Sequence, residues 1–290
     1  EFIVWSNEEG GKTGSRAIAG AVKPVEHALP SLGERSLGEG MQFLGGDPDQ
    51  LDSVIRSPGD ITAYLELHIE QGPILEAEGK DIGVVTHGQG LWWLQCTVTG
   101  KDAHTGSTPM NMRVNAGLGM ARVLEKVDEI AWSHAPSAVG AAGHIDVFPN
   151  SRNVIPGKVV FTVDFRSPEL EVIEDMELRL REEGADIVEA LDMKIEFEKV
   201  GGFDPVKFDE TCVGAVRNAA DRRGYSHLDI ISGAGHDACW INGVAPTAMV
   251  MCPCVDGLSH NEAEEISKEW AMAGADVLLH AVLETAEIVG

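Results

Sequence analysis

The feature that most constrains this 290-residue chain is a change in the order of its expected helices and strands. Up to about residue 87 and again after about residue 205, strand-like runs alternate with amphipathic helical runs, which favours a parallel-rich sheet covered on both faces. Between these positions the expected order is β-α-β-β-α-β, which is typical of a ferredoxin-like sandwich. The sequence therefore predicts an α/β domain with a mixed, parallel-rich sheet, interrupted by a smaller α+β domain.

The expected boundaries divide the chain into residues 1–87, 88–205 and 206–290. The first and third parts together form the α/β domain, and the second part is the inserted domain. Four apolar residues follow Glu1, so residues 1–5 are expected to form a buried strand.

Composition narrows the possible partners and compartments. The formal net charge of −25 repels phosphates and anionic lipid, so we expect neither a nucleic acid nor a membrane as a partner. The chain also has no apolar run long enough to cross a bilayer. Its five scattered cysteines do not suggest a disulfide scaffold, which favours a reduced, cytoplasmic protein. Cys252 and Cys254 could bind a metal, but a second pair is missing.

Polar residues follow several of the expected strands. Glu8 and Glu9 stand before two glycines that permit a bend, and two such carboxylates repel each other unless a cation lies near them. His68 and His260 also come at or after strand ends, where α/β sheets bind ligands. Imidazole and carboxylate together suit zinc, manganese, cobalt or nickel. The alternative is that each of these residues is a solvated or hydrogen-bonded structural residue.

Seven ordered motifs carry a resemblance to a known family. They run from residue 1 to about residue 265 and read NEEG, ELHIEQGPILE, DAHTGSTPM, NVIPG, DFRS, SGAGHDA and GLSHNEAE. In this order they resemble a family of metal-dependent amidohydrolases that holds N-carbamoyl-L-amino-acid hydrolases, allantoate amidohydrolases and yeast-type β-ureidopropionases. This family lies within a clan of two-domain metallo-aminoacylases and carboxypeptidases.

The resemblance implies a site with two divalent metal ions. It implies that Glu8 is the general base for the attacking water, and that Glu9, His68 and His260 are metal ligands. It also implies that the larger domain is catalytic and that the inserted domain is a lid that forms a homodimer. His104 is then both a catalytic donor to the oxyanion and a substrate contact, supplied by the small domain or by the partner subunit.

Five further residues are expected to bind the substrate. A planar, bidentate cation suits a carboxylate, so Arg166 is expected to bind that group. By resemblance the other contacts are Gln71, Asn153, Gly235 and His236. Each also has an ordinary explanation, such as a surface salt bridge for Arg166 or a turn position for Asn153.

The chain departs from the family pattern in two places. The family carries two further ligands, a His and a bridging Asp, upstream of the glutamate pair, so we expect this chain to be a fragment. The loop after the pair, GGKTGSRAIAGA, is shorter than usual. The leading hypothesis is hydrolysis of an N-carbamoyl-L-amino acid or ureido acid. The alternatives are an allantoate amidohydrolase, and an inactive ligand-binding or dimerising relative that has lost its metal site.

Overall fold

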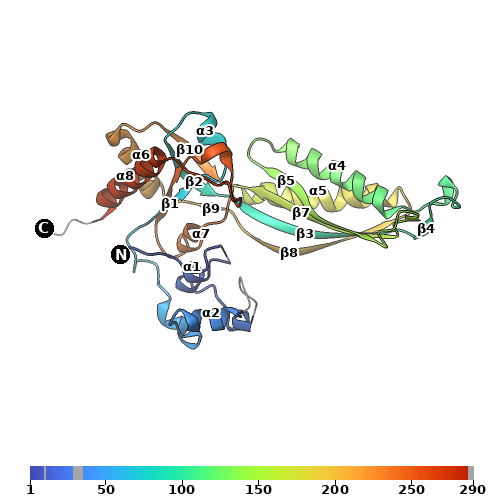
Figure 1. Cartoon of the computed structure of the whole chain (residues 1–290), viewed down its shortest axis with the longest axis horizontal. Helices are drawn as coiled ribbons and strands as arrows, with labels where there is room; N and C mark the ends of the chain where they lie inside the picture. The colour runs from blue at the N-terminus through green and yellow to red at the C-terminus, as the bar shows by residue number, and fades with distance from the viewer. Residues whose placement is uncertain (10, 29–34, 287–290) are drawn as a thin grey trace. The chain divides into compact units, whose positions relative to one another are not determined.

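The computed structural model of the chain describes residues 1–9, 11–28 and 35–286, which form two compact units (Figure 1). The first unit combines residues 1–88 with 206–290, and the second comprises residues 89–205. In chain order, the elements of the first unit are α1 (Thr13–Ile18), η1 (Pro24–Ala28), α2 (Leu37–Phe43), η2 (Pro48–Val54), β1 (Tyr64–Ile69), α3 (Ile74–Ala77), β2 (Ile82–Gly88), β9 (Val206–Lys207), α6 (Glu210–Arg223), β10 (His227–Ser232), α7 (Asp237–Ile241), β11 (Thr247–Cys252), η4 (Val255–Gly257) and α8 (Lys268–Thr285).

The sheet of the first unit has the strand order β1-β11-β2-β10, with β9 paired to β2. Strands β1 and β11 are parallel, and so are β10 and β2. In contrast, β11 and β9 each run antiparallel to β2. The described sheet is therefore mixed, with parallel and antiparallel pairings in equal number.

Helices α6 and α8 pack together against this sheet. Their buried residues Val216 and Val277 join Val84 of β2 and Val250 of β11 in one apolar core. Gly274 of α8 permits the close approach, because an added Cβ would lie 2.2 Å from the Sγ atom of Cys252. This packing fixes the strands whose ends carry several of the predicted site residues.

The second unit contains a four-stranded antiparallel sheet in the order β5-β7-β3-β8, which is the ferredoxin-like strand order. Helices α4 and α5 contribute Val127 and Leu180 to a core with Leu94 and Phe161 of the sheet. Strands β4 and β6 form a separate two-stranded ribbon. In chain order, the elements are β3 (Gly90–Thr99), β4 (Ala103–His104), η3 (Met110–Met112), α4 (Ala116–Ser133), β5 (Val139–Phe148), β6 (Val154–Ile155), β7 (Lys158–Ser167), α5 (Leu170–Glu189) and β8 (Lys194–Phe203).

The prediction of a buried strand at residues 1–5 is wrong. The segment pairs with no strand of the described residues, and the side chains of Phe2 and Val4 are 90% and 81% exposed. An apolar run becomes a strand only when a neighbour supplies backbone hydrogen bonds and a covering face. Here residues 1–5 instead line a cavity of about 870 Å³ together with parts of β1 and α8.

Within the described ranges, no helix has both the length and the apolar character that spanning a membrane would require.

Candidate functional site

The two adjacent glutamates lie on a turn, as their sequence context predicts. Asn7 adopts a left-handed backbone conformation with φ of 59°, and its Nδ2 atom donates to Thr13 Oγ1 at 2.7 Å. The two carboxylates of this turn contact different residues. Glu8 Oε1 lies 3.1 Å from Lys12 Nζ, whereas Glu9 Oε2 lies 3.5 Å from His260 Nε2.

The structure thus brings together two of the three predicted metal ligands. His260 lies in the loop after β11 and also has a left-handed backbone, with φ of 54°. Glu9 and His260 have side chains that are 68% and 71% exposed, so both are open to an ion from solution. Strained backbone at such a position is common at ligand-binding sites. The pair offers one carboxylate and one imidazole, which suit a divalent transition metal.

His68, the third predicted ligand, lies on β1 opposite Met251 of β11. Its Nδ1 atom is 2.7 Å from the carbonyl oxygen of Ile69. Because a carbonyl oxygen can only accept, we assign the ring proton to Nδ1, which leaves the lone pair of Nε2 for a ligand. Groups of three or more His, Cys, Asp or Glu side chains placed to hold a metal do not occur among the described residues, so His68 is not gathered with Glu9 and His260.

His236 forms a buried cluster beside His68. The two rings have centroids 4.5 Å apart and meet edge to face. The His236 side chain is 1% exposed, and burial lowers its pKa to about 3, so the ring is neutral. Its Nε2 atom is 2.7 Å from Ser232 Oγ, a hydroxyl that donates to the carbonyl of Ala234. The ring therefore donates through Nε2 and presents a bare Nδ1.

The bare Nδ1 of His236 has no hydrogen-bond partner within the described part of the chain, and it lies 3.9 Å from Glu66 Oε1. Glu66 is a site residue that the sequence analysis missed. Burial raises its pKa to about 7, and its Oε2 atom accepts from the hydroxyl of Tyr64 and the backbone of Ala238, each at 2.8 Å. Alternate residues of a strand share one face, so Tyr64, Glu66 and His68 point the same way. That spacing could have revealed Glu66.

Asp237 is a second buried carboxylate next to the turn. It accepts a hydrogen bond from the hydroxyl of Ser15 in α1, and burial raises its pKa. Asp237, Glu8 and His68 line the same cavity of about 870 Å³. The predicted base Glu8, the predicted ligand His68 and the buried carboxyl group of Asp237 therefore face one cavity.

Gln71 and Gly235 lie on loops at the ends of β1 and β10. Gln71 has a left-handed backbone, with φ of 56°, and its Nε2 atom donates to Ser259 Oγ at 2.8 Å. It thereby connects the loop after β1 to the residue that precedes His260. Gly235 is half-buried and immediately precedes His236.

In the second unit, His104 ends β4 of the β4-β6 ribbon, and Asn153 immediately precedes β6. The backbone N–H of Thr105 donates to the carbonyl of Asn153 at 2.9 Å. The Nδ1 atom of His104 accepts from the backbone N–H groups of Gly106 and Ser107, both at 3.1 Å. These two bonds place the ring proton on Nε2, so His104 presents an N–H donor.

Arg166 lies near the opposite end of β7 from this ribbon. At about 3.4 Å per residue, the strand separates Lys158 from Arg166 by roughly 27 Å. The guanidinium of Arg166 donates to both oxygens of Asp164, with Nε 3.1 Å from Oδ1 and Nη2 2.8 Å from Oδ2. Trp93 Nε1 donates to the same carboxylate at 3.0 Å. The structure therefore brings His104 and Asn153 together but does not bring Arg166 to them within one unit.

Comparisons with known proteins show which proteins this chain is similar to. The profile of peptidase family M20/M25/M40 matches residues 1–284. An N-carbamoyl-L-amino-acid amidohydrolase of Rhizobium meliloti is 56% identical over 292 residues, which cover 98% of this chain and 69% of that protein. An allantoate amidohydrolase of Escherichia coli (strain K12) is 31% identical over 271 residues, which cover 91% of this chain and 65% of that protein.

A solved structure is also similar. It is the crystal structure of an amidase of the hydantoinase/carbamoylase family from Burkholderia multivorans, with 46% identity and a TM-score of 0.89. The match covers 99% of this chain and 70% of that one. Both the sequence and the fold are thus similar to amidases over nearly the whole chain.

Proposed function

The chain belongs to peptidase family M20/M25/M40, and from that premise we propose that it is a metal-dependent amidohydrolase that removes the N-carbamoyl group of an L-amino acid. Hydrolysis would release the amino acid, ammonia and carbon dioxide. The observation that carries the proposal is the distance of 3.5 Å between Glu9 Oε2 and His260 Nε2. Glu8 lies next to Glu9 on the same turn. This meeting of two segments far apart in sequence supports the proposed roles of Glu8 as the base and of Glu9 and His260 as metal ligands.

The residues present fit a divalent metal by their ligand types. Glu9 and His260 would hold one ion, and His68 would offer Nε2 to the second. Zinc, manganese, cobalt and nickel all suit this chemistry. When bound, such an ion acidifies a water molecule and polarises the amide carbonyl.

The chain's own groups supply the proton transfer and the orientation. Glu8 accepts the proton of the attacking water, and Lys12 holds this carboxylate in place at 3.1 Å. His104 donates a hydrogen bond from its Nε2–H group to the oxygen on which negative charge develops. Arg166, oriented by Asp164, binds the substrate carboxylate, while Gln71, Asn153, Gly235 and His236 complete the substrate contacts.

We expect the metal-loaded protein to release ammonia from N-carbamoyl-L-amino acids. Chelation should abolish this activity, and one of zinc, manganese, cobalt or nickel should restore it, because the metal supplies the reactive water. Ammonia release from allantoate in the same assay tests the alternative that the 31% identical relative suggests, since both substrates carry a carboxylate. A metal-free protein that binds ureido acids without turning them over would contradict the enzymatic proposal.

The proposal also gives the second unit the role of a lid and dimerisation domain in a cytoplasmic homodimer. Strand β5 lies at the edge of its sheet and exposes Val139, Ile145 and Phe148, which favours pairing with a second copy. A dimer also accounts for the position of Arg166 at the end of β7 far from the ribbon that carries His104, since the strand separates Lys158 from Arg166 by roughly 27 Å. One subunit could then supply His104 to the site of the other.

We expect the wild-type protein to sediment as a dimer and Ile145→Lys to sediment as a monomer, because a charge on an edge strand opposes strand pairing. Ile231→Lys is the matched control, since Ile231 is an exposed residue of β10, an edge strand of the other sheet. This control should remain dimeric. Sedimentation of the wild type as a monomer would contradict the proposed assembly.

A further inference from the structure

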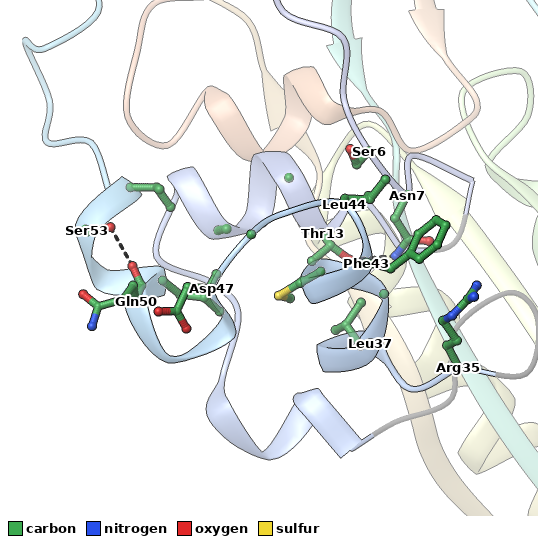
Figure 2. Close-up of a pocket in the computed structure, with 17 residues that line it drawn as sticks. Ser6, Asn7, Thr13, Arg35, Leu37, Phe43, Leu44, Asp47, Gln50 and Ser53 are labelled. Atoms are coloured by element: carbon green, nitrogen blue, oxygen red, sulfur yellow. Dashed lines mark hydrogen bonds between the residues drawn. The ribbon is translucent and has the colours of Figure 1, made fainter.

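Not every cavity of the first unit belongs to the predicted site. A cavity of about 660 Å³ lies among α1, α2 and η2, and Ser6, Leu37 and Phe43 are among the residues that line it (Figure 2). Within the described ranges, it shares no lining residue with the cavity at Glu8, so we assign it no part in substrate binding. The predicted contact with the substrate carboxylate, Arg166, lies in the second unit.

Trp93 lies beside Arg166 on the sheet of the second unit. Strands β3 and β7 run antiparallel, and Trp93 is paired with Asp164, two residues before Arg166. Alternate residues of a strand share a face, so Asp164 and Arg166 point the same way, and Trp93 is their neighbour across the strands. Leu94 and Val163, which point to the other face, belong to the core that α4 and α5 cover. The three side chains therefore lie on the face of the sheet that these helices do not cover.

One carboxylate connects the tryptophan to the arginine. The indole Nε1 atom of Trp93 donates to Asp164 Oδ2 at 3.0 Å, and Nη2 of Arg166 donates to the same oxygen at 2.8 Å. Nε of Arg166 also donates to Oδ1 at 3.1 Å. The indole bond opposes rotation of the carboxylate about its Cβ–Cγ bond, and the carboxylate in turn fixes the plane of the guanidinium. The orientation of Arg166 thus depends on Trp93.

Gly201 leaves room for the ring of Trp93. It is the partner of Trp93 on β8, the strand on the other side of β3. A Cβ atom added to Gly201 would lie 3.1 Å from Cε3 of Trp93, so a larger residue would crowd the ring. Trp93 is 45% exposed, so its position is set by its neighbours across the strands, Asp164 and Gly201, more than by burial in the core.

We propose that Trp93 is a positioning residue for substrate binding. Through Asp164, its indole N–H holds the guanidinium of Arg166 in the orientation that receives the substrate carboxylate. The inference rests on the proposed function, which gives Arg166 this role. An arginine that is held before the substrate arrives loses less side-chain entropy on binding. Trp93 therefore contributes to affinity for the carboxylate and not to bond breaking, whose base, Glu8, lies in the other compact unit.

Trp93→Phe tests this role, because phenylalanine keeps an aromatic ring but has no N–H group to donate to Asp164. With N-carbamoyl-L-leucine and the metal-loaded protein, KM should rise about three- to tenfold, which is the usual worth of one hydrogen bond. The value of kcat should stay within about twofold of the wild type, since the lost interaction is made equally in the ground state and the transition state. An unchanged KM, or a fall in kcat alone, would overturn the inference.

Trp132→Phe is the matched control. Trp132 is another exposed tryptophan of the second unit, but it lies near the end of α4 and not on the sheet face that carries Arg166. Its kcat and KM should equal those of the wild type. An equal rise of KM in both variants would mean a general effect on the second unit, and the proposed role of Trp93 would be wrong.

A neutral analogue separates the positioning of Arg166 from a general effect on the site. N-carbamoyl-L-leucinamide has no carboxylate, so titration calorimetry should give it the same affinity for the wild type and for Trp93→Phe. In contrast, N-carbamoyl-L-leucine should bind about three- to tenfold more weakly to the variant. Equal weakening of both compounds would contradict a role that acts through Arg166.

Calorimetry also separates this inference from the proposed function, because binding is measured without turnover. If the wild type binds N-carbamoyl-L-leucine but does not hydrolyse it, the proposed function fails. The positioning role still stands if Trp93→Phe then binds this compound about three- to tenfold more weakly than the wild type and Trp132→Phe do. Equal affinities in all three proteins, or no binding by the wild type, would overturn it.

Discussion

Glu8→Gln is expected to reduce turnover of N-carbamoyl amino acids by about 10²–10⁴-fold while leaving the metal content unchanged. Glutamine has nearly the same size as glutamate but cannot accept the proton of the attacking water. Glu8 pairs with Lys12, whereas it is Glu9 that faces His260, so the substitution leaves the Glu9–His260 pair in place. The measurement is kcat together with the metal-to-protein ratio of the purified variant.

The matched control for this prediction is Glu262→Gln. Glu262 is exposed in the loop just after His260. Its substitution therefore removes a negative charge near the site but leaves the base, Glu8, in place. Its turnover should equal that of the wild type. If Glu8→Gln loses its metal, the roles of Glu8 and Glu9 are reversed, and if it retains full turnover, Glu8 is not the base.

Glu9→Ala and His260→Ala are each expected to weaken metal binding by at least about 100-fold. Loss of a residue that only hydrogen-bonds to a metal ligand already costs about 10–100-fold in metal affinity, and loss of a direct ligand should cost more. Because the two side chains face each other at 3.5 Å, they should act as a unit. The double variant should therefore bind metal about as weakly as either single variant. Competition with a chromogenic chelator measures the affinity.

Two further variants complete this experiment. His68→Ala tests whether the Nε2 lone pair, left open by the bond of Nδ1 to the Ile69 carbonyl, also binds an ion. His104→Ala is the control, because His104 lies in the other compact unit and should lose activity but retain metal. Wild-type metal affinity in both Glu9→Ala and His260→Ala would exclude the proposed metal site.

Part of the site could be predicted from local patterns in the sequence. Glu8 and Glu9 before a glycine pair predict a turn, and the structure has a turn there. His68 was expected near a strand end and lies one residue before the end of β1. These features depend on a few neighbouring residues, whose backbone preferences act over short distances.

Other parts could not be predicted from such patterns. The apolar run at residues 2–5 has the composition of a strand, but strand formation depends on a partner elsewhere in the chain. The spacing places Glu66 on the same face of β1 as His68, but its pKa of about 7 arises from burial, which a sequence pattern does not show. The pairing of Arg166 with Asp164, two residues away, was also missed, although both point to the same face of β7.

By itself, the sequence determined the order of helices and strands after the first five residues, the ferredoxin-like pattern of the inserted segment and the motifs of the family, because all of these depend on residue spacing. Only the tertiary structure decided that Glu9 meets His260, that His236 is buried and neutral, and that Glu8 and His68 line one cavity. Each of these features depends on contacts between distant segments. Such contacts form only when the sheet, its helices and its loops pack together, so no local spacing encodes them.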